Sequence, residues 1–131
     1  HINKNVKFRE YFRPFAPAIL ATKQKKYFDL NQRSEHMLIA CSANKLAKTE
    51  IPATVHVDGT SRVQTVTKST NNKFWKLLKS FEKKTNIPVL LNTSFNVKGE
   101  PIVNDIDDAL RCFKKYNIDF LVIDEFLIEK T

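Results

Sequence analysis

The chain has 131 residues, of which 42% are hydrophobic and 27% charged, and this composition excludes a disordered chain and predicts one soluble globular domain. No apolar run approaches the ~20 residues of a membrane span and no signal peptide is recognisable, so we expect a cytoplasmic protein. The net charge of +8 is uneven: residues 1–99 carry 18 Lys and Arg against 6 Asp and Glu, and residues 100–131 carry 4 against 8. A basic body of this kind favours nucleic acid, a phosphorylated small molecule or an acidic partner surface.

Cysteine and histidine usage argues against disulfides and metal. Cys41 and Cys112 stand far apart and form no CxxC, which predicts two buried, reduced thiols. The three histidines lack metal-ligand spacing, so we expect no metal site. Because the first residue is His1 rather than Met, we expect a fragment of a longer polypeptide.

The first segment interleaves cations with aromatic rings. Lys7, Arg9 and Arg13 alternate with Phe8 and Phe12, and the prolines that follow argue against a long helix. In an extended segment the cations would project from one side as a phosphate clamp while the rings anchor the other. The alternative is a basic surface segment held to the core by its rings.

The next elements are short. Residues 16–20 and 37–43 have the composition of strands. Residues 23–33 suggest a loop or a short helix, and residues 44–50 a charged connection.

Residues 51–68 predict a hairpin or a sharp corner. Asp58-Gly59 is a strong turn signal between two β-branched runs. The turn would gather His56, Arg62 and Gln64, and Arg62 could present its fork of donors to a phosphate. The alternatives are a structural histidine and an exposed arginine at a turn.

Residues 71–86 form the clearest predicted helix, with Phe74, Leu77, Leu78 and Phe81 at helical spacing and Asn71 or Asn72 as the N-cap. Residues 89–91 predict a strand buried on both faces.

Polar residues follow this strand directly, before a turn at Gly99. They are Asn92, Thr93, Ser94 and Asn96. Ligands of α/β proteins bind at the carboxyl ends of strands, so these side chains are candidate ligand contacts. The alternative is a polar turn whose side chains act as caps.

The last third predicts a helix over residues 105–116 that Asn104 caps, and two short strands, 120–123 and 126–128, around Asp124-Glu125. The order of elements predicts an α/β fold: a mixed, twisted β-sheet with helices packed on it.

Three motifs together resemble one family. They are KFREYFRPFAP (residues 7–17), PATVHVDGTSRVQTV (52–66) and PVLLNTSFNVKGEPIV (88–103), followed by DDAL (107–110). In this order they resemble the C-terminal domain of the carbamoyltransferases that include NodU, TobZ and CmcH. The family has a GPRALG-like segment before the first motif, so the resemblance predicts that residues 1–131 are this domain truncated at its N-terminal side, and its last element is expected to be missing too.

The resemblance implies a YrdC-like fold and an activity. The domain would bind ATP, with Mg²⁺ expected beside it, and carbamoyl phosphate, and would form carbamoyl-adenylate. A separate N-terminal kinase/glycoprotease-like domain, which carries the metal, would then transfer the carbamoyl group to an acceptor hydroxyl. Lys7, Arg9 and Arg62 are the expected catalytic cations, and the other expected ligand contacts are Arg13, His56, Gln64, Asn92, Thr93, Ser94 and Asn96.

The rival interpretation is an RNA-binding module with a basic concave face, although nucleic acid is the less expected partner. A third is a fragment that only docks onto its partner domain and is inert alone.

Overall fold

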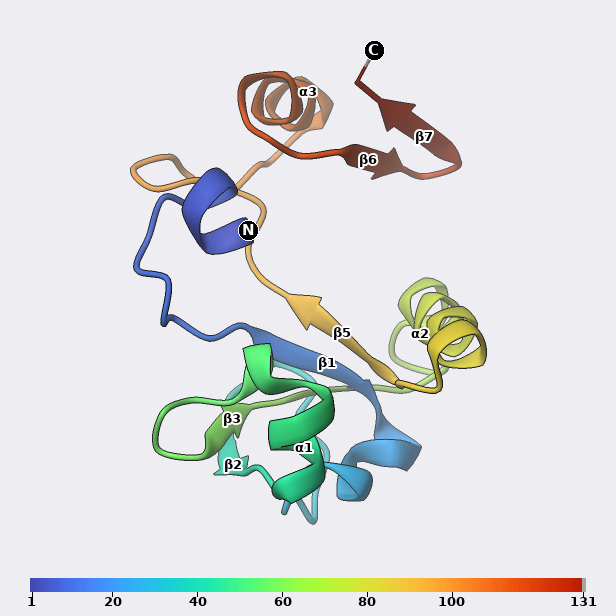
Figure 1. Cartoon of the computed structure of the whole chain (residues 1–131). Coiled ribbons are helices and arrows are strands. Elements are labelled where there is room, and N and C mark those ends of the chain that lie inside the picture. The colour runs from blue at the N-terminus through green and yellow to red at the C-terminus, as the bar shows by residue number, and fades with distance from the viewer. Residues whose placement is uncertain (131) are drawn as a thin grey trace. The chain divides into compact units, whose positions relative to one another are not determined.

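The computed structural model describes residues 1–130, which form two units. The first, the sheet unit, comprises residues 14–93. The second, the terminal unit, joins residues 1–13 to the chain from Ser94 onward. Figure 1 shows the elements of each.

A three-stranded mixed sheet organises the sheet unit. Its middle strand is β1 (Ala16–Leu20), where the sequence predicts it. β1 pairs in parallel with β4 (Gln64–Val66) and antiparallel with β5 (Val89–Asn92). The predicted α/β class, a mixed sheet with helices packed on it, is therefore confirmed.

Helix α2 (Asn72–Thr85) packs against β1 and β5 (Figure 1). It begins where predicted, because the Asn71 side chain accepts a hydrogen bond from the backbone N–H of Phe74 at 3.0 Å. Its buried stripe differs in part from the prediction. Leu78 is buried and Phe74 and Trp75 pack beside it, whereas Leu77 is 55% exposed.

Strands β2 (Ala40–Ser42) and β3 (Thr60–Arg62) pair antiparallel. The strand predicted over residues 37–43 is therefore shorter than expected. The turn at Gly59 is present, with φ +83°, but it does not join two paired strands. The chain before it forms a 3₁₀ turn, η3 (Pro52–Thr54), because a proline at the first position favours a helical start. The segment is a corner rather than a hairpin.

The prediction of a charged connection over residues 44–50 is wrong, because this segment forms helix α1 (Lys45–Glu50). The Asn44 side chain caps it by accepting the N–H of Ala47 at 3.0 Å. Its charges lie on the exposed face while Ala47 is fully buried. Charge alone did not distinguish a short capped helix from a loop.

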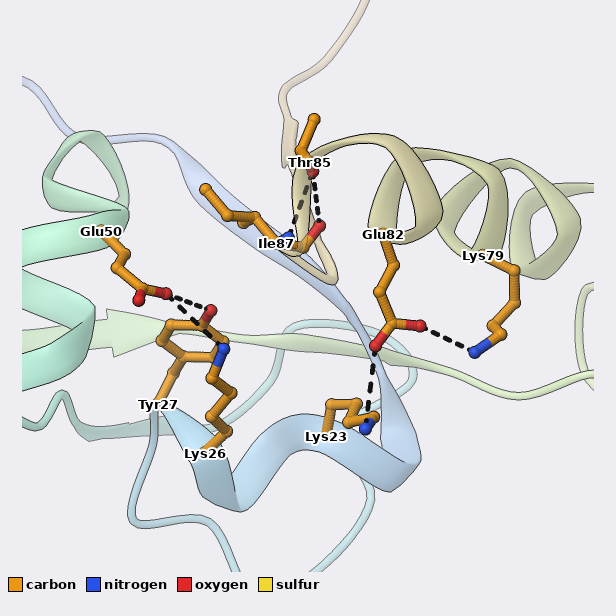
Figure 2. A network of polar contacts seen from close by, with 8 residues as sticks. All are labelled: Lys23, Lys26, Tyr27, Glu50, Lys79, Glu82, Thr85 and Ile87. Carbon is orange, nitrogen blue, oxygen red and sulfur yellow. Dashed lines mark hydrogen bonds and ion pairs between the residues drawn. The ribbon is translucent and has the colours of Figure 1, made fainter.

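A 3₁₀ helix, η2 (Ala21–Lys26), lies between α1 and α2 and is tied to both by polar contacts (Figure 2). The hydroxyl of the buried Tyr27 donates to the Glu50 carboxylate at 2.5 Å. The Glu82 carboxylate of α2 pairs with Lys79 Nζ at 2.7 Å and with Lys23 Nζ at 3.8 Å. The ion pairs of the half-exposed Lys23 and Lys79 each contribute at most about 1 kcal/mol to stability.

The sheet unit, residues 14–93, has two hydrophobic clusters. One joins Ile19 of β1 to Tyr27, to Phe28 and to Ala47 of α1, and the other joins Leu20 of β1 to Leu78 of α2. The strand β5 was predicted to be buried on both faces, which is wrong at Leu91, 44% exposed. β5 is the edge of the sheet, and the core beneath this face ends at Val89.

The terminal unit contains a π-helical turn, η1 (Ile2–Val6), helix α3 (Ile106–Lys115) and a hairpin of β6 (Phe120–Ile123) and β7 (Phe126–Glu129). The hairpin is predicted correctly. The cap of α3 is Asp105 rather than Asn104, because the Asp105 carboxylate accepts the N–H of Asp108 at 2.8 Å. Ala109 and Phe113 of α3 pack with Leu121.

No helix among residues 1–130 has the length and apolarity needed to cross a bilayer. Both cysteines are buried free thiols, as the sequence predicts.

Candidate anion-binding site

The cationic segment at the start of the chain is not extended, contrary to the prediction. One π-helical turn precedes Lys7, and Phe8 has φ +48°. The rings anchor it only in part: Phe12 is 63% exposed, whereas the Phe8 ring, 51% exposed, lies 5.8 Å from the Tyr116 ring. The bend at Phe8 nevertheless leaves Lys7, Arg9 and Arg13 lining one pocket.

Lys7 is buried, 7% exposed, and its side chain holds the turn of Ser94 and Asn96. Its ammonium donates to the backbone oxygens of Ser94 at 2.7 Å and Asn96 at 2.8 Å. It also contacts their side-chain oxygens, Asn96 Oδ1 at 2.8 Å and Ser94 Oγ at 3.2 Å. All four acceptors are neutral, and no Asp or Glu within residues 1–130 forms an ion pair with Lys7.

Arg9 is oriented by a residue that the sequence analysis did not single out. The buried side chain of Asn3 accepts a hydrogen bond from Arg9 Nε at 2.8 Å. Its amide nitrogen donates to the backbone oxygens of Tyr11 at 3.1 Å and Arg13 at 2.7 Å. Asn3 thereby fixes the backbone that carries Arg9 and Arg13. An asparagine outside any helical or strand pattern gives no sequence signal for such a role.

The pocket has a volume of about 270 Å³ and lies wholly within the terminal unit. Lys98 and Gly99 complete its rim, and Gly99 has the positive φ, +82°, that the turn needs. Among residues 1–130, four cations and two carboxylates line it, which leaves an excess of two positive charges. The cations are Lys7, Arg9, Arg13 and Lys98, and the carboxylates are Glu10 and Glu100.

Both carboxylates already have cationic partners. The Glu10 carboxylate lies 3.7 Å from the Arg13 guanidinium. The Glu100 carboxylate accepts hydrogen bonds from Lys115 Nζ at 2.8 Å and from the Tyr116 hydroxyl at 2.7 Å. The pocket therefore favours an anion from outside the described chain.

The pKa values agree with this excess of positive charge. Burial, and then the nearby Arg9, lower the pKa of Lys7 below its ordinary value. Burial and Arg13 likewise lower the pKa of Arg9. An incoming anion would raise the pKa values of Lys7 and Arg9 again, because a nearby negative charge stabilises the charged form of a base.

Five other predicted site residues lie in the sheet unit. Asn92 and Gln64 are brought together, with Asn92 Nδ2 donating to Gln64 Oε1 at 2.6 Å. Arg62 is exposed on β3, and His56 lies in the turn before it, where its backbone N–H donates to Thr60. Thr93 is exposed at the end of β5. Their convergence with Lys7 stays a prediction.

Among residues 1–130, no cluster of three or more His, Cys, Asp or Glu side chains could hold a metal ion. Lys98 is the pocket cation that the sequence analysis missed. Its signal was available, because it directly precedes the glycine of the turn.

Comparison with known proteins identifies the family. Residues 1–130 match the carbamoyltransferase C-terminus family. The chain is 39% identical to the nodulation protein NolNO of Sinorhizobium fredii, over 98% of this chain and 19% of that protein. It is 38% identical to nodulation protein U of Azorhizobium caulinodans, over 79% of this chain and 18% of that protein.

An uncharacterized protein of Synechocystis is 41% identical over 99% of this chain and 24% of its own length. The chain thus spans about a fifth to a quarter of the length of these relatives. The match over nearly every residue shows that the chain belongs to the carbamoyltransferase C-terminal family.

Proposed function

We propose that the chain is the adenylate-forming C-terminal domain of a cytoplasmic O-carbamoyltransferase. It binds ATP and carbamoyl phosphate and forms carbamoyl-adenylate, and a preceding domain transfers the carbamoyl group to an acceptor hydroxyl. The observation that carries this proposal is the buried Lys7 ammonium, held by neutral oxygens in a pocket with excess positive charge. Relatives that are four to five times longer support the assignment of the chain to one domain of a larger enzyme.

The reaction balances with water as co-reactant. Water first hydrolyses carbamoyl phosphate to inorganic phosphate and carbamate, which carries a free carbamoyl oxygen. That oxygen attacks the α-phosphorus of ATP, and the bond to the bridging oxygen breaks with release of pyrophosphate. Negative charge develops on phosphoryl oxygens, so fixed cations and donors supply the stabilisation and no covalent enzyme intermediate is needed.

Each pocket residue has a proposed role. Arg9, with Arg13 in support, binds the phosphate of the carbamoyl donor through its planar fork of donors. Lys7 adds its charge and holds Ser94 and Asn96 in place, because its hydrogens already contact their oxygens.

The residues of the sheet unit complete the proposal. Arg62 is a second phosphate contact, and His56, Gln64, Asn92 and Thr93 hold the nucleotide or the carbamoyl end. Mg²⁺ is proposed to enter on the phosphates of ATP, because Mg²⁺ in nucleotide sites is bound largely through substrate phosphates.

The test is ATP–pyrophosphate exchange that depends on carbamoyl phosphate, measured in the full-length protein. We expect Lys7→Ala and Arg62→Ala to abolish the exchange, and Lys4→Ala, an exposed lysine of the same segment, to leave it unchanged. Exchange that persists in both variants would show that neither Lys7 nor Arg62 takes part in forming carbamoyl-adenylate.

A further inference from the structure

A second pocket, in the sheet unit, is lined by none of the residues that the proposed function uses. It has a volume of about 700 Å³, within the range of small-molecule sites, and we call it the Trp75 pocket. Its walls come from η2, the loop of residues 31–33, the end of β4 and helix α2. The lining residues are Ala21, Thr22, Gln24, Lys25, Asn31, Gln32, Arg33, Val66, Thr67, Lys68 and Trp75.

The strand register separates this pocket from Asn92 and Thr93. β1 and β4 run in parallel and end together at Leu20 and Val66, and the pocket is lined by Ala21, the residue after β1, and by Val66 and Thr67 at the end of β4. Asn92 pairs with Ala16, at the opposite end of β1. The Trp75 pocket thus lies at the carboxyl ends of two adjacent parallel strands, where α/β folds commonly bind ligands.

The lining chemistry is cationic and aromatic. Lys25, Arg33 and Lys68 contribute three positive charges, and no Asp or Glu of the described chain lines the pocket. Lys68 Nζ lies 6.0 Å from the centre of the Trp75 ring. An indole face beside lysine and arginine offers both a stacking surface and phosphate partners.

The wall that carries Arg33 is held in position. The buried Gln24 side chain donates to the backbone oxygens of Leu30 at 2.7 Å and Gln32 at 3.1 Å. On the other side of Arg33, Ser34 N–H donates to Thr65 Oγ1 at 2.8 Å. The loop is therefore fixed before any ligand arrives, which lowers the entropic cost of binding.

We propose that the Trp75 pocket is a second ligand site, for a nucleoside monophosphate. The base stacks on Trp75, and the phosphate contacts Arg33 and Lys68. This site is separate from the carbamoyl phosphate pocket, so it can be present or absent whichever way the proposed function is decided.

Trp75 is the only tryptophan of the chain, so its fluorescence reports on this pocket. AMP, GMP, adenosine and inorganic phosphate are titrated separately into the 131-residue chain, with free tryptophan amide correcting for absorbance. We expect AMP and GMP to quench Trp75, and adenosine and phosphate to bind at least about tenfold more weakly, because each lacks half of the contacts.

Variants decide where the signal arises. Arg33→Ala and Lys68→Ala are expected to weaken AMP binding about tenfold each, and the matched control Lys84→Ala, exposed on α2, to leave it unchanged. Arg9→Ala, in the other pocket, should not alter the Trp75 response. Calorimetry in the full-length protein repeats the Arg33→Ala and Lys84→Ala comparison.

Three outcomes would overturn the proposal. The first is unchanged Trp75 fluorescence up to about 10 mM AMP, above any useful affinity. The second is equal binding by Arg33→Ala, Lys68→Ala and the control, in the chain or in the full-length protein. The third is far tighter binding of single-stranded RNA with a steep salt dependence, which would make this a nucleic-acid surface instead.

Discussion

At the scale of residues, Lys7 is the decisive feature. A buried ammonium whose described hydrogen-bond partners are all neutral is costly, and proteins keep such a charge where it serves a ligand or holds a turn in place. Lys7 holds the turn in place through its hydrogen bonds to Ser94 and Asn96, and it lines the pocket that Arg9 also lines. Arg9 in turn depends on Asn3 for its orientation.

Replacing Lys7 should therefore affect stability as well as activity. Lys7→Met keeps the apolar stem but leaves the oxygens of Ser94 and Asn96 without their donor, and should lower the unfolding free energy by about 2–3 kcal/mol. Urea denaturation measures this, with the exposed Lys4→Met as control. Equal stability of the two variants would show that the Lys7 contacts contribute nothing to the fold.

Asn3 gives a second test at this scale. Asn3→Ala removes the acceptor of Arg9 Nε and the donors to Tyr11 and Arg13. Since Asn3 positions Arg9, we expect carbamoyl phosphate to bind about tenfold more weakly while ATP saturation changes little. The neighbouring Asn5→Ala is the control, because its side chain contacts only the exposed His1 ring among the described contacts. A variant that binds carbamoyl phosphate normally would contradict the positioning role.

At the scale of elements, α2 depends on its cap. Asn71→Ala removes the acceptor of the Phe74 N–H and should lower stability by about 1 kcal/mol, whereas Asn72→Ala, one residue into the helix, should have little effect. Thermal unfolding of both variants checks this. If Asn72→Ala were the more damaging change, the assigned helix start would be wrong.

Helix α3 is fastened at its last turn by Glu100. Hydrogen bonds from Lys115 and Tyr116 lower the pKa of Glu100 below its ordinary value of 4.5 and stabilise its ionised form. A carboxyl whose pKa is depressed by folding contributes stability above the unfolded pKa, and that stability is lost as the pH falls through the folded pKa. We therefore expect this contact to be intact at neutral pH and lost in acid below 4.5.

Carboxyl NMR titration of Glu100 measures its pKa directly. Glu100→Gln should flatten the stability curve in that acid range. A measured pKa above 4.5 would contradict the contact.

The elements also show what sequence reasoning reaches. α2, β1 and the β6–β7 hairpin were predictable because hydrophobic period, caps and turn residues are local signals. α1 was missed because six residues give too short a period and Asn44 was not taken as a cap. The pocket formed by Lys7, Ser94 and Asn96 joins residues nearly ninety positions apart, and only the resemblance to a family predicted it.

At the scale of the whole molecule, the uneven charge now has a structural counterpart. Four cations of the terminal unit line one pocket, and three cations of the sheet unit line the Trp75 pocket. The acidic residues after position 99 include the first turn of α3, where the helix dipole favours them, and Glu100, which is already paired. Part of the net charge of +8 is therefore gathered in these two pockets, and other cations, such as Lys76 and Lys83, lie exposed on α2.

Whether the pocket of Lys7 and Arg9 binds carbamoyl phosphate is measured by calorimetric titration of carbamoyl phosphate into the full-length protein and its Arg9→Ala variant, with Lys4→Ala as control. We expect Arg9→Ala to weaken binding by about tenfold or more and Lys4→Ala to bind like the parent protein. Equal affinity of all three proteins for carbamoyl phosphate would contradict binding in this pocket.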